Sequence, residues 1–520
     1  MTPSPRPVAT DRAALLDRLG QAGRFDVAVV GGGATGLGVA LDAASRGLRV
    51  VLLEGQDFAR GTSSRATKLL HGGVRYLAQG NVGLVKEALH ERTTVLRNAP
   101  HLAQPLPFVM PSYKAWETPF YGIGLKMYDA LAGRAGLGST DFLGREATLR
   151  ALPTLRTEGL KGGVRYWDGL FYDARRAVAL ARTAATYGAL LVNHCPVTGL
   201  LHEHGKLAGL RCEDRDSGRA FEVRARCVIN ATGVWVDGLR QQDGAARQAN
   251  VRPMVAPSQG VHVVVDRDFM PGGHALLVPK TRDGRVLFAV PWLGKLVLGT
   301  TDTPRRDLPR EPDAFAEELE FILSEASQAL SRPVRREDIR SLWVGLRPLV
   351  AAPEAAEGGT KVLSREHTIV VDANGLVTVT GGKWTTYRAM AEDVLERCFD
   401  HQLLPRRAGG QSAQHVLLGA GAVSSPAVPL HAAPGPHLYG TEQARVAACP
   451  GQAVPLGAGL TEAMVRYAAR FEHAQTVEDV LARRWRVLFL DAAEAARMAP
   501  AVAAILVEEL GADPDLAAFQ

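Results

Sequence analysis

The stretch Phe25–Glu54 constrains the fold of this 520-residue chain more than any other segment. It reads FDVAVVGGGATGLGVALDAASRGLRVVLLE, in which two short apolar runs enclose a glycine-rich turn and an apolar helical face. Apolar runs rich in β-branched residues are typical of strands buried on both faces of a parallel sheet. The segment therefore predicts a βαβ unit at the start of a doubly wound α/β fold.

The turn in this unit has the spacing G-x-G-x-x-G, with Gly31, Gly33 and Gly36. The first glycine permits a tight turn, the second lets the backbone approach a pyrophosphate, and the third lets the helix pack closely on the sheet. Glu54 ends the second strand, where a carboxylate can accept hydrogen bonds from a ribose diol. Because strand, glycines, helix, strand and acid occur in register, we predict a cofactor that contains ADP.

Length and composition bound the remaining possibilities. A chain of 520 residues is too long for one core, so two or three domains are expected. No run of 18 apolar residues occurs, which predicts no membrane-spanning helix. Met1–Gly23 lacks the apolar core of a signal peptide and is expected to be a loose tail. The five cysteines show no C-x-x-C spacing, which indicates a reducing, cytosolic environment without disulfides or structural zinc.

The order of patterns along the chain predicts a discontinuous domain organisation. Four β-rich runs between Arg252 and Asp302 indicate a second, largely antiparallel domain inserted into the first. The expected parts are an N-terminal tail (1–24), a cofactor-binding domain (25–90, 171–250 and 350–400), a substrate domain (91–170 and 251–349), and a linker with a C-terminal helical domain (401–520).

Within the last part, residues 402–456 are rich in Gly, Pro and Ala and are interpreted as the linker. The sequence Thr476-Val-Glu-Asp479 resembles a capping box at a helix start. Arg483, Arg484 and Arg486 follow shortly afterwards, and their simplest interpretation is a solvated helix face.

Three further features favour FAD over a nicotinamide cofactor. Thr62, Ser63 and Ser64 offer hydroxyls to phosphate and ribityl oxygens. The strand Val228–Gly233 (VINATG) ends in a glycine that can return to the same crevice. The segment Thr378–Arg388 (TVTGGKWTTYR) predicts a strand, two glycines and a helix whose N-terminus would stabilise negative charge on a reduced flavin. Each feature alone fits an ordinary βα turn, but together they predict FAD.

The candidate cofactor-binding residues follow from these motifs. They are Gly31, Gly33, Gly36, Glu54, Thr62, Ser63, Ser64, Lys68, Leu70, His71, Val197, Ala231, Thr232, Gly233, Gly382 and Lys383. Since no His or Cys lies in an obvious flavinylation motif, the FAD is expected to be non-covalent, and no metal is expected.

Three cationic residues lie in contexts that suit an anionic substrate. Arg75 lies in HGGVRY, Arg347 lies in the apolar stretch WVGLRPLV, and Lys383 follows two glycines. Converging on one crevice, they would bind a phosphate dianion, with Tyr76 and Thr385 as neutral donors. An arginine in an apolar strand can equally be the partner of an internal ion pair. The formal net charge of +6 is compatible with an anionic substrate, nucleic acid or lipid, or with none of them.

His262, in QGVHVVV, is the best candidate for a general base. Oxidation of an alcohol requires removal of the hydroxyl proton as hydride leaves carbon, and histidine is the side chain suited to that task near neutral pH. The alternative is a histidine that is satisfied within the core.

The motifs VVGGGATGLG, TSSRATKLLHGGVRYL, NATGVW, GTTDT, GLRPL and GGKWTTYR together resemble the FAD-dependent sn-glycerol-3-phosphate dehydrogenase family. The resemblance extends from Phe25 beyond Lys383 and includes Val465–Ala492, which is similar to the family's helical cap. It implies oxidation of glycerol 3-phosphate at C2 to dihydroxyacetone phosphate, with hydride passing to flavin N5 and electrons passing to membrane quinone.

The resemblance also assigns roles to particular residues. It implies that substrate is held by Arg75, Tyr76, Arg347, Lys383 and Thr385, and that His262 and Arg347 are catalytic. The family's KGSH segment corresponds to Gln259-Gly260-Val261-His262, in which the lysine and the serine are replaced and the histidine is kept.

The expected partners include a membrane. Tyr113–Arg134 lies where family members are thought to touch the bilayer, which implies a cytoplasmic protein peripherally bound to the inner face of the cell membrane. A helix packed under the substrate domain is the alternative. A homodimer is left open.

Three rival functions remain at this point. They are an oxidase of the same fold that uses oxygen, a glycine- or sarcosine-type amine oxidase, and a flavin-binding RNA-associated protein. The amine oxidases need one carboxylate-binding arginine, whereas this chain offers three cations. No aromatic-plus-basic motif predicts nucleic-acid binding.

Overall fold

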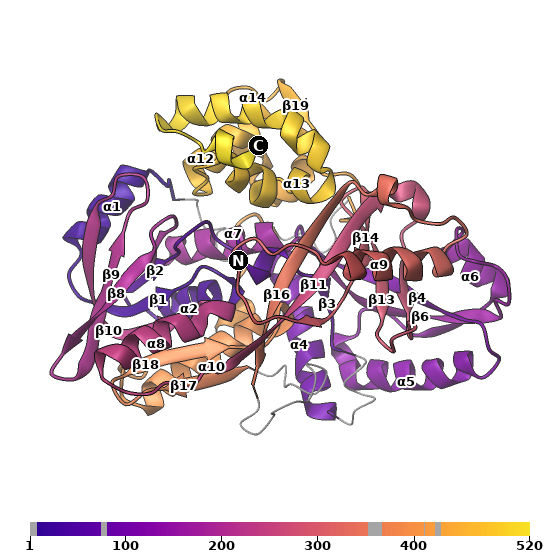
Figure 1. Ribbon diagram of the computed structural model, residues 1–520, viewed down its shortest axis with the longest axis horizontal. Helices are drawn as coiled ribbons and strands as arrows, with labels where there is room; N and C mark the ends of the chain where they lie inside the picture. Colours follow the sequence, from indigo (N-terminus) through magenta and orange to yellow (C-terminus); the bar gives the residue numbers. More distant parts are fainter. Residues whose placement is uncertain (1–7, 74–80, 352–366, 410, 422–427) are drawn as a thin grey trace.

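The computed structural model describes residues 8–73, 81–351, 367–409, 411–421 and 428–520 (Figure 1). The predicted substrate residues Arg75 and Tyr76 lie outside these ranges. In the described part of the chain, most strands belong to two large sheets, and helices close to the C-terminus cover one end of the molecule.

The first sheet contains the predicted βαβ unit. Its strands lie in the order β17 (Thr368–Val371), β18 (Leu376–Thr380), β10 (Ala220–Asn230), β1 (Phe25–Val30), β2 (Val50–Leu53) and β7 (Leu190–Val192). The strands from β18 to β7 run parallel, and β17 is antiparallel to β18. A hairpin of β8 (Val197–Glu203) and β9 (Lys206–Glu213) extends from β10. The apolar runs at both ends of the unit are therefore buried parallel strands, as predicted.

Alternate residues of β1 face opposite sides of this sheet. Val27 and Val29 pack in one cluster with residues of α2 (Ala34–Ser45), α7 (Asp173–Thr186) and α10 (Tyr387–Asp400). Ala28 and Val30 pack in another cluster with residues of β8, β9 and β10. Both faces of the sheet are thus covered, which explains why its strands are apolar throughout rather than alternating.

The prediction of a loose N-terminal tail is wrong for the residues described there. Arg12–Gln21 forms helix α1, which Asp11 caps by accepting a hydrogen bond from the Ala14 amide. Leu15, Leu16 and Leu19 share one side of the helix and are buried against the first sheet. This short apolar stripe was sufficient to dock the helix, although the prolines and mixed charges around it resemble those of a disordered terminus.

The second sheet is mainly antiparallel. Its strands include β4 (Ala103–Ser112), β6 (Gly162–Phe171), β11 (Val255–Asp266), β12 (Ala275–Val278), β13 (Leu287–Trp292), β14 (Lys295–Gly299) and β16 (Ser341–Val350). Strands β3 (Leu69–Leu70), β5 (Asp141–Gly144) and β15 (Thr303–Pro304) lie at its margins. Among the described strands of this sheet, β4 and β12 pair in parallel and the other neighbours pair antiparallel. The four β-rich runs between Arg252 and Asp302 correspond to β11, β12, β13 and β14.

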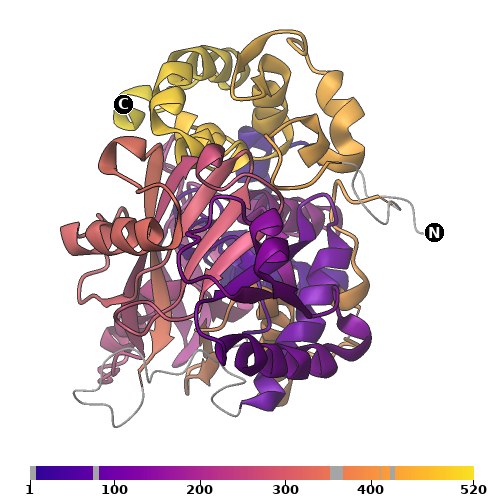
Figure 2. The ribbon, with the colours of Figure 1, turned by 90° about the vertical axis from the view of Figure 1, so that its right-hand side faces the viewer.

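Helices cover the second sheet at its periphery. They are α4 (Val82–Asn98), α5 (Glu117–Ala132), α6 (Arg145–Ala151) and α9 (Ala316–Ala329). In both views, α5 lies at the end of the molecule opposite to the C-terminal helices (Figures 1 and 2). Among the residues that the structure describes, no helix has the length and apolar character needed to span a bilayer.

The C-terminal helices are α11 (Gln443–Ala447), α12 (Glu462–Phe471), the π-helix η10 (Asp479–Arg484), α13 (Val487–Leu490), α14 (Ala492–Leu510) and α15 (Leu516–Phe519). The predicted capping box precedes η10, since the Asp479 amide donates to Thr476 Oγ1 (3.1 Å) and the Thr476 amide donates to Asp479 Oδ2 (3.1 Å). The prediction of a linker over 402–456 is wrong for much of the described segment, because Leu417, Leu430 and Tyr439 are buried in the main core.

Candidate active site

The glycine turn after β1 leaves space that the protein itself does not fill. Gly31 has φ +106°, and a Cβ there would lie 2.6 Å from the Ala231 carbonyl oxygen. A Cβ at Gly36 would overlap the Gly31 carbonyl oxygen. At Gly33, in contrast, a Cβ would meet only Ser63 Oγ, at 3.2 Å. Packing therefore requires glycine at 31 and 36, whereas Gly33 keeps the approach to the α2 N-terminus open, which fits a pyrophosphate.

Glu54 is held beside this turn by backbone amides. Its Oε2 accepts a hydrogen bond from the Gly32 amide (2.6 Å), and its Oε1 accepts one from the Gln56 amide (2.9 Å). Burial raises the pKa of the Glu54 carboxyl, and the two amide hydrogen bonds oppose that shift. Each carboxylate oxygen has a second lone pair, so the group is oriented to accept a hydrogen bond from a ribose hydroxyl.

Residues 55–68, here called the cofactor loop, follow β2 and contact three other parts of the site. Ser63 Oγ accepts a hydrogen bond from the Ala34 amide at the start of α2 (2.9 Å). Thr62 Oγ1 donates to the Leu346 carbonyl in β16 (2.6 Å), and Trp384 Nε1 donates to the Ser63 carbonyl (2.8 Å). The loop thus joins the glycine turn, the second sheet and the segment after β18.

Lys68, a predicted cofactor ligand, lies inside the protein. Its Nζ is 2.6 Å from Asp173 Oδ2 and donates to the Ser64 carbonyl (2.9 Å). It also lies 4.6 Å from the centroid of the Trp343 ring. Burial lowers the pKa of Lys68 to about 7, although Asp173 opposes that shift. Its described contacts are therefore with the protein's own groups.

Five further predicted cofactor residues lie at the carboxyl ends of two strands, β10 and β18. Ala231, Thr232 and Gly233 follow β10, and Gly233 accepts a hydrogen bond from Thr380 Oγ1 at the end of β18 (3.1 Å). Gly382 has φ +73°, and Lys383 precedes the short helix η7 (Trp384–Thr386). Because the carboxyl ends of parallel strands meet at one edge, these residues lie beside the glycine turn.

Three other predicted cofactor residues lie outside these two strand ends. Leu70 is buried in β3, His71 follows it, and Val197 begins β8. Thr385, predicted to bind substrate, is buried and its Oγ1 donates to the His71 carbonyl (3.4 Å).

Arg347 lies in β16 opposite Ser258 of β11. Its guanidinium donates to the Gln259 carbonyl (3.1 Å), the Thr301 carbonyl (2.8 Å) and Thr300 Oγ1 (3.1 Å), and Nη1 is 3.3 Å from Asp302 Oδ1. A Cβ at Gly260 would overlap this guanidinium, so the glycine makes room for it. The internal ion pair that the sequence left as the alternative is present, and it fixes the orientation of the guanidinium.

His262 is buried in β11, two residues after Gly260. Its Nε2 lies 2.9 Å from Thr67 Oγ1, and its ring stacks on Trp343 with centroids 5.1 Å apart. Burial, and then the positive charges of Lys68 and Arg347, lower the pKa of His262 well below its usual value. The lowered pKa keeps the imidazole neutral near pH 7, which is the protonation state that a general base needs before it reacts. Sequence reasoning missed Thr67 and Trp343, although both lie in motifs that it quoted.

Two family models match the chain. They are FAD dependent oxidoreductase, over residues 26–393, and C-terminal domain of alpha-glycerophosphate oxidase, over residues 435–516. The mitochondrial glycerol-3-phosphate dehydrogenase of Mus musculus is 41% identical, and the similarity covers 96% of this chain and 72% of the mouse protein.

Solved structures give the same grouping. The glycerol-3-phosphate dehydrogenase from Bacillus halodurans, complexed with FAD, has a TM-score of 0.78 at 28% identity and is matched over 98% of this chain and 95% of its own. The L-alpha-glycerophosphate oxidase from Mycoplasma pneumoniae with FAD bound has a TM-score of 0.57 at 18% identity, over 75% of this chain and 98% of its own, and shares the fold alone.

The two sheets and the glycine turn, together with the match over residues 26–393, define an FAD-dependent oxidoreductase. The expected fold class and the FAD cofactor are thereby confirmed. Within this class, the chain belongs to the glycerol-3-phosphate dehydrogenase family, as its resemblance implied.

Proposed function

We propose that this enzyme oxidises sn-glycerol 3-phosphate at C2 to dihydroxyacetone phosphate. FAD, when bound, supplies the hydride acceptor at N5. His262 accepts the proton of the C2 hydroxyl, and Arg347 and Lys383 bind the phosphate, with Thr385 as a neutral donor. Arg75 and Tyr76 complete this set by resemblance. The observation that supports the proposal most is the neutral, buried His262 beside the oriented guanidinium of Arg347.

The position of Arg347 supports its role with an anion. Its ion pair with Asp302 and its bonds to two carbonyl groups hold the guanidinium in place before substrate arrives. A preorganised cation loses little conformational entropy when it binds an oxyanion.

The reaction and its electron acceptor can be tested in one experiment. The purified protein is mixed anaerobically with glycerol 3-phosphate, and then either a quinone or oxygen is added. We expect bleaching of the flavin by the substrate and rapid reoxidation by the quinone. Rapid reoxidation by oxygen with formation of peroxide would identify the oxidase alternative, which the match to an oxidase C-terminal domain keeps open. Absence of bleaching would contradict the proposed substrate.

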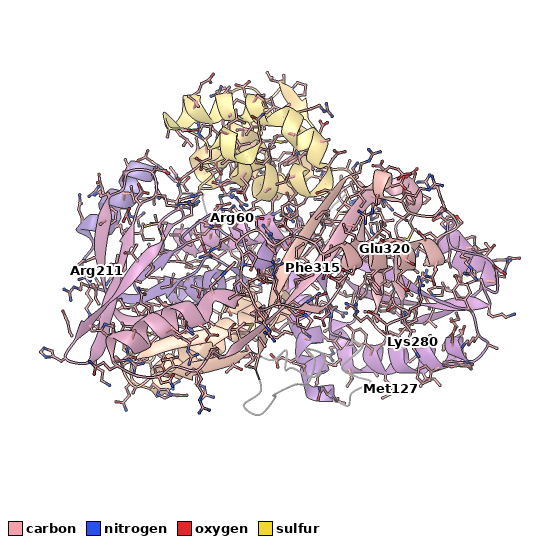
Figure 3. All side chains as sticks on the ribbon, viewed as in Figure 1. Arg60, Met127, Arg211, Lys280, Phe315 and Glu320 are labelled. Carbon is pink, nitrogen blue, oxygen red and sulfur yellow. The ribbon has the colours of Figure 1, made fainter. Side chains whose placement is uncertain are left out.

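We further propose that α5 contacts the inner face of the cell membrane, where a lipid-soluble quinone would be reduced. Trp116, Phe120, Ile123 and Met127 are each more than half exposed, and their spacing puts them on one stripe of the helix. Figure 3 shows Met127 on this outer side of α5. Tyr128, an aromatic residue of the same segment, is instead buried and donates to Asp168 (2.9 Å). Exposed apolar stripes of this kind suit an interfacial helix.

A further inference from the structure

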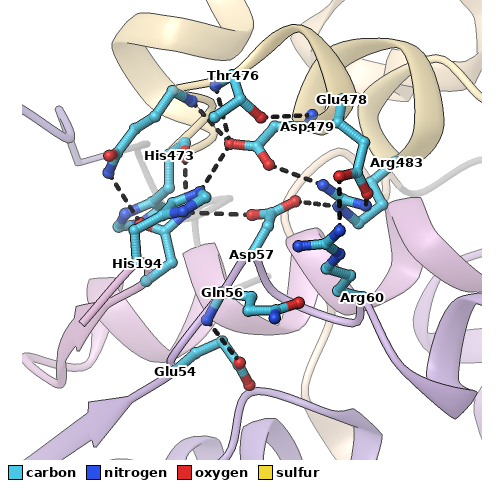
Figure 4. Close-up of polar contacts among 12 residues, drawn as sticks. Glu54, Gln56, Asp57, Arg60, His194, His473, Thr476, Glu478, Asp479 and Arg483 are labelled. Carbon is cyan, nitrogen blue, oxygen red and sulfur yellow. Dashed lines mark hydrogen bonds and ion pairs between the residues drawn. The ribbon is translucent and has the colours of Figure 1, made fainter. Parts of the chain in front are cut away.

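Three arginines at the C-terminal end of the chain point into the protein rather than into solvent. Arg483 and Arg484 lie in η10, Arg486 precedes α13, and all three are at most 2% exposed. The prediction that they form a solvated face is therefore wrong. Each of them has a partner in the cofactor loop, more than 400 residues earlier in the chain, and Figure 4 shows the pair of Arg483 with Asp57.

Asp57 is the main partner. Arg484 Nη2 donates to Asp57 Oδ1 (2.9 Å), and both Arg483 and Arg484 form ion pairs with Asp57 Oδ2. Asn193 Nδ2 also donates to Asp57 Oδ1 (3.1 Å). Asp57 lies three residues after Glu54, so the arginines hold the beginning of the cofactor loop.

Arg486 holds the other end of the same loop. Its Nη2 donates to the Ser64 carbonyl (2.5 Å) and lies 3.9 Å from Asp173 Oδ1. Ser64 directly follows Ser63, whose Oγ accepts a hydrogen bond from the Ala34 amide beside the glycine turn. Two separate contacts from the C-terminal helices therefore reach both ends of the cofactor loop.

The opposite side of the cofactor loop contacts the glycine turn. Glu54 accepts from the Gly32 amide, and the Ala59 amide donates to the Gly32 carbonyl (2.9 Å). A Cβ at Gly32 would lie 2.6 Å from the Phe58 ring, which shows how closely the two segments pack. The cofactor loop is thus enclosed between the glycine turn and the C-terminal helices.

The same cluster contains three groups in an arrangement that could hold a metal ion. Ligand atoms of Asp57, His194 and Asp479 lie within 4.8 Å of one another. However, Asp57 is paired with two guanidinium groups, and Asp479 is paired with Arg483 (2.7 Å) and His194 (2.9 Å). The buried carboxylates are thus compensated by the protein's own cations, and we assign no metal to this cluster.

We propose that Arg483, Arg484 and Arg486 are positioning residues that hold the cofactor loop in its FAD-binding conformation, so that docking of the C-terminal helices and binding of FAD are coupled. By linkage, FAD must then stabilise the docked C-terminal helices by the same factor by which docking strengthens FAD binding. The inference rests on FAD as the cofactor, and it does not depend on the substrate or the electron acceptor.

The coupling is testable in the parent protein without any substitution. Hydrogen exchange of residues 479–490 is compared between the deflavinated protein and the FAD-loaded protein. We expect slower exchange at these residues when FAD is bound, although none of them belongs to the predicted FAD-binding set. Equal exchange in the two forms would overturn the proposal.

Variants then assign the coupling to the arginines. The dissociation constant of FAD is measured by flavin fluorescence on deflavinated Arg484→Ala and Arg484→Lys. Removal of a charged hydrogen bond predicts at least ~10-fold weaker binding for the alanine variant and partial rescue by lysine. A purely structural role would lower the Tm of the deflavinated protein and leave the FAD dissociation constant unchanged, and this result would overturn the proposal.

Arg466→Ala is the matched control. Arg466 lies in α12 of the same helical region and forms ion pairs with Glu462, Glu508 and Glu509, none of which belongs to the cofactor loop. We expect it to change the FAD dissociation constant by less than about twofold. A loss equal to that of Arg484→Ala would attribute the effect to general destabilisation and would also overturn the proposal.

Discussion

Arg347 pairs with Asp302 and is also proposed to bind the substrate phosphate. Substitution of Arg347 tests the second role. We expect Arg347→Ala to reduce kcat/KM for glycerol 3-phosphate at least ~10-fold, since a charged hydrogen bond contributes about 1.5–3 kcal/mol. Flavin content should stay unchanged. Steady-state kinetics with a soluble dye acceptor measure the loss. Arg340→Ala is the control, because Arg340 lies just before β16 and forms an exposed pair with Asp266. Equal activity of the two variants would remove Arg347 from the substrate site.

The pair between His194 and Asp479 makes the stability of the protein depend on pH. Burial disfavours the imidazolium, but the Asp479 carboxylate, with help from Asp57 and against Arg12, raises the pKa of His194 overall. A raised pKa means that the pair stabilises the fold fully below the ordinary histidine pKa of about 6.5 and that this stability is lost as pH rises through the raised value. Asp479 stays ionised throughout, because its pKa is well below its usual range.

We therefore expect the Tm difference between the parent and His194→Gln to be largest near pH 6 and to shrink as pH rises. Differential scanning calorimetry from pH 6 to 9 measures this difference. A Tm difference that is constant over this range would show that His194 does not change its charge in the native state.

Individual residue types could be predicted from sequence better than their partners. His262 and Arg347 were selected because an imidazole and a guanidinium are rare in apolar strands. His262 and Thr67 are 195 positions apart in the chain, and a local sequence pattern cannot predict a contact between residues so far apart. For the same reason, the pair of Asp57 with Arg484 was missed, and charged residues near a helix start were interpreted as exposed.

At the scale of elements, α5 provides a test of membrane binding. Lys114 and Lys126 are exposed beside its apolar stripe, and each lysine near an anionic leaflet contributes about 1 kcal/mol. We expect Lys114→Glu together with Lys126→Glu to weaken co-sedimentation with anionic vesicles and to slow quinone reduction, while activity with a soluble dye is retained. High salt should weaken binding of the parent without abolishing it, since the apolar stripe remains.

Charge reversal at Lys206 and Arg211 is the control for this variant. Both are exposed on the hairpin of β8 and β9, and Figure 3 shows Arg211 on the far side of the molecule from Met127. Unchanged vesicle binding by the α5 variant would mean that another surface docks to the membrane.

Elements with strong periodicity could be predicted closely from sequence. The βαβ unit and the strand before the two glycines at 381 and 382 lie where the patterns indicated. The predictions failed where a weak pattern depended on tertiary contacts. Helix α1 is stabilised by three leucines that dock on a sheet, and residues of the expected linker pack into a core that their local composition does not reveal.

At the scale of the whole molecule, we expect FAD to be bound without a covalent bond, because no His or Cys lies in an obvious flavinylation motif. We expect the purified protein to be yellow and to release its flavin into the supernatant when it is precipitated by heat or acid. Fluorescence of the supernatant measures the released FAD. Flavin that remains with the precipitated chain would show a covalent bond instead.

The contact between Asp57 and Arg484 joins residues 427 positions apart. At a synthesis rate of about 5–20 residues per second, Asp57 is translated about 20–85 s before Arg484. During that interval the nascent chain already carries the glycine turn, but the Asp57 carboxylate has no guanidinium to meet. From the proposed coupling we therefore expect firm capture of flavin to be a late event in the biogenesis of this enzyme, with an unfinished site on ribosome-bound intermediates.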